Sequence, residues 1–191
     1  MLNPLITALV FLVSTVFGIY ILLIMLRFLL QLLRVSFRNH SILRLLLRLT
    51  NPPLQLLYNF IPGWKNIDVA AIVLMLVLKM LELMLIKWLL NEPFGVMGLL
   101  LFAVANLLSL LIYIFIFALI IQAILSWITP PHTYNPLTDL LYDLNEPLLR
   151  PVRRKIPPVQ GLDISPMVVI VGLIVAEIVV VGYLLAFGKI L

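Results

Sequence analysis

Residues 97–128 read MGLLLFAVANLLSLLIYIFIFALIIQAILSWI and contain no acidic or basic side chain. A helix needs roughly 20 residues to cross a bilayer core about 30 Å thick. The stretch is therefore long enough to span a membrane. Three more stretches of this kind lie at residues 4–33, 67–90 and 164–188. The sequence predicts an all-α membrane protein with four transmembrane helices, because the runs are too long and unbroken for barrel strands.

The composition supports this class. Apolar residues make up 64% of the chain and charged residues 11%, whereas a soluble domain is about half apolar and a quarter charged. The chain has no cysteine, which excludes structural disulfides and thiolate metal sites. The net charge of +5 lies mostly in the connections between spans, so the expected partner is an anionic bilayer surface and not nucleic acid.

The lysines and arginines between the spans are distributed unevenly. Nine lie in the connections after the first and third spans: Arg34, Arg38, Arg44, Arg48, Lys65, Arg150, Arg153, Arg154 and Lys155. Two lie on the opposite side: Lys87 and Lys189. Basic loops remain on the cytoplasmic side of a membrane. We therefore expect both long connections in the cytoplasm and both termini on the external side.

An internal repeat emerges when the chain is shifted by 95 residues. The matched residues that are not apolar include Pro52 with Pro147, Asp68 with Asp163 and Glu82 with Glu177. Each half has two spans with a short amphipathic segment between them. We therefore predict two parallel repeats, 1–95 and 96–191, related by an axis along the membrane normal.

The two amphipathic segments carry opposite charges at matched positions. Arg44 and Arg48 correspond to Asp139 and Asp143 in the 95-residue shift. Each pair is spaced i, i+4 and so lies on one helix face, while leucines in residues 136–144 form an apolar face. We predict that the cationic face meets the acidic one. The alternative is two polar faces that are solvated separately.

A basic stretch follows the second amphipathic segment. Pro147 and Pro151 are expected to end the helix there. Four cations lie beside them: Arg150, Arg153, Arg154 and Lys155. These side chains are candidates for binding lipid or a partner at the headgroups. The alternative is that they only set topology and anchor the chain.

Four ionisable residues lie inside the predicted spans: Arg27, Lys79, Glu82 and Glu177. Charge at membrane depth is costly, so each is a candidate functional residue. Lys79 lies three residues before Glu82 and is expected to neutralise it. For Glu177 the nearest polar candidates are Asn106 and Ser109. The alternatives are polar contacts between helices and protonation or cation binding.

The stretch NPLTDLLYDLNEPLLRPVRRKIPPVQGLDISPMVV (135–169) resembles the signature of the YggT family, also called YlmG. The first repeat keeps a degenerate form of it, with NPP, IPG and an Asp. The resemblance implies a small integral protein of the bacterial inner membrane, from a family without an established biochemical activity. Members are associated with osmotic stress and ion homeostasis, and photosynthetic relatives with division or cytochrome assembly.

No enzyme motif is present. The sequence contains no HExxH, P-loop, Gly-rich dinucleotide turn or nucleophile elbow, and His40 and His132 lack metal-ligand spacing. We expect no catalytic residue, metal or cofactor. The predicted function is a non-enzymatic scaffold or assembly factor whose basic cytoplasmic surface binds anionic lipids, a membrane-protein partner or a second copy. The alternative is an ion or osmolyte pathway that uses Glu82 and Glu177.

Overall fold

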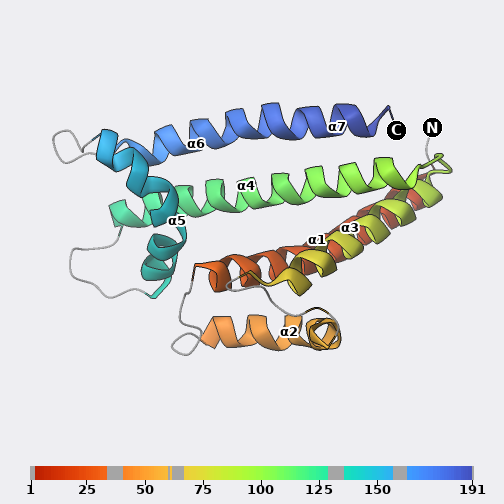
Figure 1. The fold of residues 1–191 in the computed structure, drawn as a ribbon, viewed down its shortest axis with the longest axis horizontal. Helices are drawn as coiled ribbons and strands as arrows, with labels where there is room; N and C mark the ends of the chain where they lie inside the picture. Colours follow the sequence, from red (N-terminus) through yellow and green to blue (C-terminus); the bar gives the residue numbers. More distant parts are fainter. Residues whose placement is uncertain are drawn as a thin grey trace. The chain divides into compact units, whose positions relative to one another are not determined.

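The computed structural model describes residues 3–33, 41–59, 61, 67–128, 136–156 and 163–190. The elements are helices (Figure 1): α1 Pro4–Leu32, α2 Ser41–Tyr58, α3 Val69–Leu89, α4 Val96–Ile128, α5 Pro136–Lys155, α6 Ser165–Ala176, the π-helix η2 Glu177–Val181 and α7 Gly182–Gly188. The predicted all-α class is confirmed. Several residues singled out in the sequence lie outside the described residues: Arg34, Arg38, His40, Lys65 and His132.

Within the described residues, four helices are long and apolar enough to cross a membrane: Pro4–Leu32, Val69–Leu89, Val96–Ser126 and Ser165–Gly188. The last comprises α6, η2 and α7, which follow one another without a break. At most 22% of the most apolar stretch in each helix is buried within the protein. The remaining apolar side chains suit contact with lipid, where a helix satisfies its own backbone hydrogen bonds. The chain thus has the features of a multi-pass membrane protein.

The chain forms two compact units. The first contains Met1–Leu108 and Val181–Leu191, and the second contains Ser109–Val180. Both boundaries fall inside continuous helical stretches, one within α4 and the other within η2, before its last residue. The two units are therefore defined by contacts between helices, whereas the predicted division at residue 95 is defined by the sequence repeat.

In the first unit, α1 and α3 lie side by side (Figure 1), and α2 packs against both. Ile24 of α1 and Leu54 of α2 are fully buried. Ala70 and Ala71 are buried at the start of α3. Small side chains at an interface let two helices approach closely, which explains why α3 begins with alanines where it is most enclosed.

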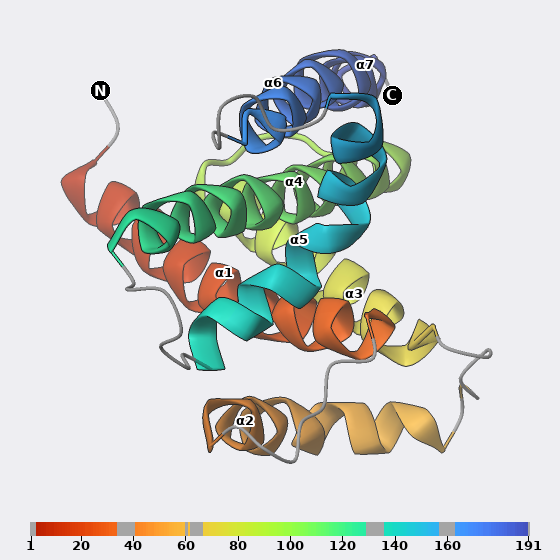
Figure 2. The ribbon, with the colours of Figure 1, turned by 90° about the vertical axis from the view of Figure 1, so that its left-hand side faces the viewer.

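In the second unit, α5 packs on α6 and runs across the direction of α4 and α6 (Figure 2). Leu119 of α4, Leu149 of α5 and Val169 of α6 form its buried core. These three side chains come from three helices, so burial of apolar area holds α5 in place.

The prediction that Pro147 and Pro151 end the second amphipathic segment is wrong, because α5 continues to Lys155. A proline inside a helix removes the hydrogen bond to the carbonyl four residues earlier. The two prolines are themselves four residues apart, so both lost bonds fall on one face. Pro147 and Pro151 are exposed, and carbonyls on an exposed face can bond to water. The helix therefore bends and does not break (Figure 1).

The first amphipathic segment also continues through its prolines. α2 contains Pro52 and Pro53, and its two ends point in different directions (Figure 2). Pro53 has no N–H to donate to the carbonyl of Leu49. The hydroxyl of Tyr20, on α1, donates to this carbonyl at 3.3 Å. A side chain from the neighbouring span thus replaces the hydrogen bond that the proline removes.

This replacement predicts coupling between Tyr20 and Pro53. Tyr20→Phe should lower the free energy of unfolding in detergent by up to about 1 kcal/mol, because the Leu49 carbonyl loses a donor. In a Pro53→Ala background the new N–H can bond to that carbonyl, so Tyr20→Phe should cost less. Helical signal followed through thermal unfolding of the four variants gives the interaction energy. An equal cost in both backgrounds would show that the hydroxyl does not compensate for the proline.

Candidate functional site

Arg27 lies near the end of α1 with 7% of its surface exposed. Its Nη1 donates to Thr50 Oγ1 at 2.9 Å and to Asn51 Oδ1 at 2.6 Å. Its Nη2 donates to the hydroxyl of Tyr58 at 3.3 Å. All three acceptors belong to α2. A guanidinium buried on a membrane-spanning helix is costly unless its donors are paired. Both Nη atoms of Arg27 bond to α2, whereas its buried Nε has no partner among the described residues, so the Nη bonds hold α2 against α1.

The same group of side chains extends to α3 through Tyr58. The Tyr58 hydroxyl donates to Asp68 Oδ2, and Asp68 Oδ1 accepts from the backbone N–H of Ala71 at 3.0 Å, which caps α3. Partial burial, followed by the hydrogen bond to Asp68, raises the pKa of Tyr58 to about 12. The hydroxyl therefore keeps its proton at neutral pH and can donate. We call Arg27, Thr50, Asn51, Tyr58 and Asp68 the first polar cluster.

A second polar cluster lies in the second unit. It consists of two groups: Gln122 of α4 with Asn145 of α5, and Glu146 and Arg153 of α5 with Asp163 before α6. Asn145 Nδ2 donates to Gln122 Oε1 at 2.7 Å. Arg153 bridges two carboxylates, with Nη1 at 3.0 Å from Glu146 Oε2 and Nε at 2.8 Å from Asp163 Oδ2. These bonds fasten α5 to the end of α4 and to the start of α6.

Asp163 is held in its ionised form. Partial burial by itself would raise the pKa of Asp163, but the backbone hydrogen bond from Ser165 and the hydrogen bond and charge of Arg153 outweigh it. The pKa therefore lies below its ordinary value of 3.8. The backbone N–H of Ser165 donates to Asp163 Oδ1 at 2.9 Å, at the first turn of α6. Asp163 thus satisfies a free N–H of α6 and binds Arg153 with its other oxygen.

The two clusters occupy the same positions in the 95-residue register. The pairs are Arg27 with Gln122, Thr50 with Asn145, Asn51 with Glu146, Tyr58 with Arg153, and Asp68 with Asp163. Only the aspartate is the same residue in both. The arginine lies on the span in the first cluster and on the amphipathic helix in the second. Each cluster therefore contains one hydrogen-bonded guanidinium, from a different helix.

The four predicted cations of α5 divide into two groups. Arg153 is paired with Glu146 and Asp163. Arg150, Arg154 and Lys155 are exposed, and we call these three the α5 basic end. The assignment of all four to lipid or partner binding remains a prediction, and the structure gives Arg153 an internal role as well.

The carboxylates within the spans have different partners. Lys79 Nζ lies 2.9 Å from Glu82, as the spacing predicted, and Glu82 is buried. Of the two predicted partners of Glu177, Ser109 donates its Oγ–H to Glu177 Oε1 at 3.4 Å, whereas Asn106 donates to the Phe102 carbonyl of its own helix at 2.7 Å. The Tyr113 hydroxyl, which was not predicted, donates to Glu177 Oε1 at 3.3 Å. Glu177 is also the first residue of the π-helix η2. π-Helical turns are frequent at functional sites, so Glu177 is the stronger candidate of the two carboxylates for a functional residue.

The predicted contact between the amphipathic segments remains a prediction. Arg44 and Arg48 are exposed on α2, and Asp139 and Asp143 are exposed on α5. The two pairs belong to different compact units, each of which is described by itself.

The model of the CCB3/YggT family matches residues 6–89 and again residues 101–184. The chain belongs to this family. Uncharacterized protein PA0392 of Pseudomonas aeruginosa is 37% identical over 94% of this chain and 91% of its own length. The uncharacterized protein YggT of Escherichia coli K12 is 31% identical over 96% of this chain and 94% of its own. No solved structure matches the chain significantly. The resemblance read from residues 135–169 is confirmed.

Most polar partners in the clusters are not distinctive in the sequence: Thr50, Asn51, Tyr58, Gln122 and Asn145. Polar residues on a short amphipathic helix, or a single amide in a span, are common. A signal was nonetheless present. At the 95-residue shift these residues align polar with polar in a chain that is 64% apolar.

The second cluster predicts how stability depends on acid. Because the pKa of Asp163 is lowered on folding, its stabilising contribution is complete above the unfolded value of about 4 and is lost as the pH falls through the folded value. Asp163→Asn should therefore flatten the fall of the melting temperature between about pH 5 and pH 2. Arg153→Gln should also flatten it, since it removes two of the causes that lower the pKa. An acid dependence in Asp163→Asn as steep as in the natural chain would contradict this assignment.

Proposed function

We propose that this chain is a non-enzymatic protein of the bacterial inner membrane that acts as a scaffold or assembly factor through the α5 basic end. The observation that carries the proposal is that the four cations at the end of α5 have two different roles. Arg153 is used internally and fixes the end of α5 beside the start of α6. Its neighbours Arg150, Arg154 and Lys155 remain exposed. The cluster thereby presents three cations from a fixed helix end.

An anionic bilayer surface is the partner that this arrangement fits best. Each cation near an anionic leaflet contributes about 1 kcal/mol, so three contribute about 3 kcal/mol. A helix end that is already fixed loses little further conformational freedom when it binds. An acidic membrane-protein partner, or a second copy of the chain, is the alternative occupant.

We also propose that the chain is a tandem duplication with parallel halves and that α2 and α5 lie on the cytoplasmic side. Two observations support the duplication: the family matches begin 95 residues apart, and both polar clusters use the same positions in that register. The uneven distribution of lysine and arginine supports the orientation. Both termini then lie on the external side.

The α5 basic end can be tested apart from the internal role of Arg153. The triple variant Arg150→Gln, Arg154→Gln, Lys155→Gln should keep the melting temperature of the natural chain and lose function. Its purified form should bind added liposomes of 30% phosphatidylglycerol much more weakly, because three cations contribute roughly a hundredfold in affinity. Binding by the natural chain should weaken with salt, since exposed charges are screened.

Arg153→Gln is the matched control, because it removes one cation from the same end of α5. It should lower the melting temperature and change liposome binding far less than the triple variant. Unchanged liposome binding in the triple variant would refute lipid docking. If only binding to an acidic protein is lost, the partner is a protein and not lipid.

A second candidate function is an ion or osmolyte pathway, relevant to osmotic stress. Glu177 favours it, because this carboxylate is approached by two neutral hydroxyls, from Ser109 and Tyr113, at the first residue of a π-helix. Glu82, by contrast, is neutralised by Lys79. In the same experiments Glu177→Gln should leave liposome binding unchanged. If it alone abolishes function, the pathway and not the scaffold is the correct reading.

A further inference from the structure

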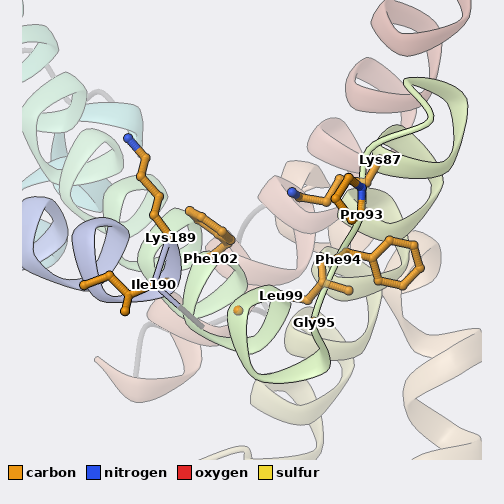
Figure 3. Close-up of a pocket in the computed structure, with 10 residues that line it drawn as sticks. Lys87, Pro93, Phe94, Gly95, Leu99, Phe102, Lys189 and Ile190 are labelled. Carbon is orange, nitrogen blue, oxygen red and sulfur yellow. The ribbon is translucent and has the colours of Figure 1, made fainter.

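A cavity of about 480 Å³ lies in the first unit, at the end of α3 where that helix passes into α4 (Figure 3). Its position is about 28 Å along α3 from Asp68, at 1.5 Å per residue. The cavity is therefore at the opposite end of the span from the first polar cluster. Its volume is within the range of sites that hold small molecules or headgroups.

Lysines and apolar side chains line this cavity together. Lys87 of α3 and Lys189 after α7 supply the charge, and Phe94, Leu99 and Phe102 supply an apolar surface. Figure 3 shows Phe102 between the two lysine side chains. A ligand that fills this site must offer both a negative group and apolar surface.

The two lysines are also distinctive in the sequence. Of the 13 lysines and arginines, Lys87 and Lys189 are the two placed at the ends of spans away from the long basic connections. Both line the same cavity, although they are 102 positions apart in the numbering. A cavity lined by two lysines favours an anionic occupant, because the positive charge attracts a negative group.

The local structure holds Lys87 in place. Its Nζ lies 5.8 Å from the centre of the Phe102 ring, a distance at which the ring face attracts a cation. Glu92 lies 3.6 Å away and offsets part of its charge. Asn91, two residues after the end of α3, has a left-handed conformation with φ 55°. The backbone N–H of the next residue, Glu92, donates to the Lys87 carbonyl at 2.9 Å. Lys189 is exposed and provides the second positive group.

We propose that this cavity binds a phosphate group, with Lys189 and Lys87 as its cationic contacts and Phe102 and Leu99 against the adjoining apolar part of the ligand. A phospholipid headgroup has this combination, and the site lies at the ends of helices that suit a bilayer. Free phosphate or a small phosphate ester shares the charged part only. The site is separate from the α5 basic end, which belongs to the other unit.

The test uses the purified full-length chain, stripped of lipid, in a neutral detergent. Native mass spectrometry during titration with phosphatidylglycerol gives the apparent Kd of the first bound lipid. Lys87→Gln with Lys189→Gln should raise this Kd at least tenfold, and Lys87→Arg with Lys189→Arg should keep it within about threefold, since the charge remains. The melting temperature of each variant without lipid, and its elution volume, show whether it is folded.

Two further arms identify the source of the phosphate and the site. Titration with inorganic phosphate or glycerol 3-phosphate should give much weaker binding than the lipid. Equally tight binding that depends on both lysines would support the site and assign it to free phosphate. The triple variant of the α5 basic end should keep the tight first lipid. If the double glutamine variant is folded and binds both lipid and phosphate as the natural chain does, the cavity is not a phosphate site.

Discussion

The charge of Arg27 is the constraint on which the first unit depends. A guanidinium on a span helix must find acceptors within the protein, because lipid offers none. Thr50, Asn51 and Tyr58 provide them from one helix, so α2 cannot move away from α1 without exposing or orphaning the charge. Leaving a charged donor unpaired costs about 1–3 kcal/mol or more. Apolar packing on α1 and α3 could tolerate sliding, whereas these directional bonds could not.

The second unit meets the same requirement with different residues. Gln122 occupies the position on the span that Arg27 has in the first unit, and it forms a neutral pair with Asn145. The guanidinium of the second cluster belongs to Arg153, which lies between Glu146 and Asp163 near the end of α5. A cation there stabilises the helix C-terminus and joins a group of exposed cations. The arginine of the second cluster thus lies on α5 beside the exposed cations, and this helix end is the docking surface that we propose.

The four spans could be predicted from the sequence because hydrophobic length alone decides whether a helix can cross a bilayer. The 95-residue register was visible because matched proline, aspartate and glutamate are rare in an apolar chain. The continuation of α2 and α5 through their prolines was not predicted. It depends on tertiary features, such as the Tyr20 hydroxyl beside the Leu49 carbonyl. Arg27 was recognised as costly, but its acceptors depend on which helix packs beside it.

The central claim is that both halves fasten their amphipathic helix at the same positions. Hydrogen–deuterium exchange of α2 amides in lipid nanodiscs tests it most directly, because local opening of a helix raises exchange. Arg27→Gln should speed exchange throughout residues 46–58 and leave α5 unchanged. Adding Thr50→Asn recreates the Gln–Asn pair of the second cluster and should restore much of the protection. Unchanged exchange in Arg27→Gln, or no recovery in the double variant, would contradict the account.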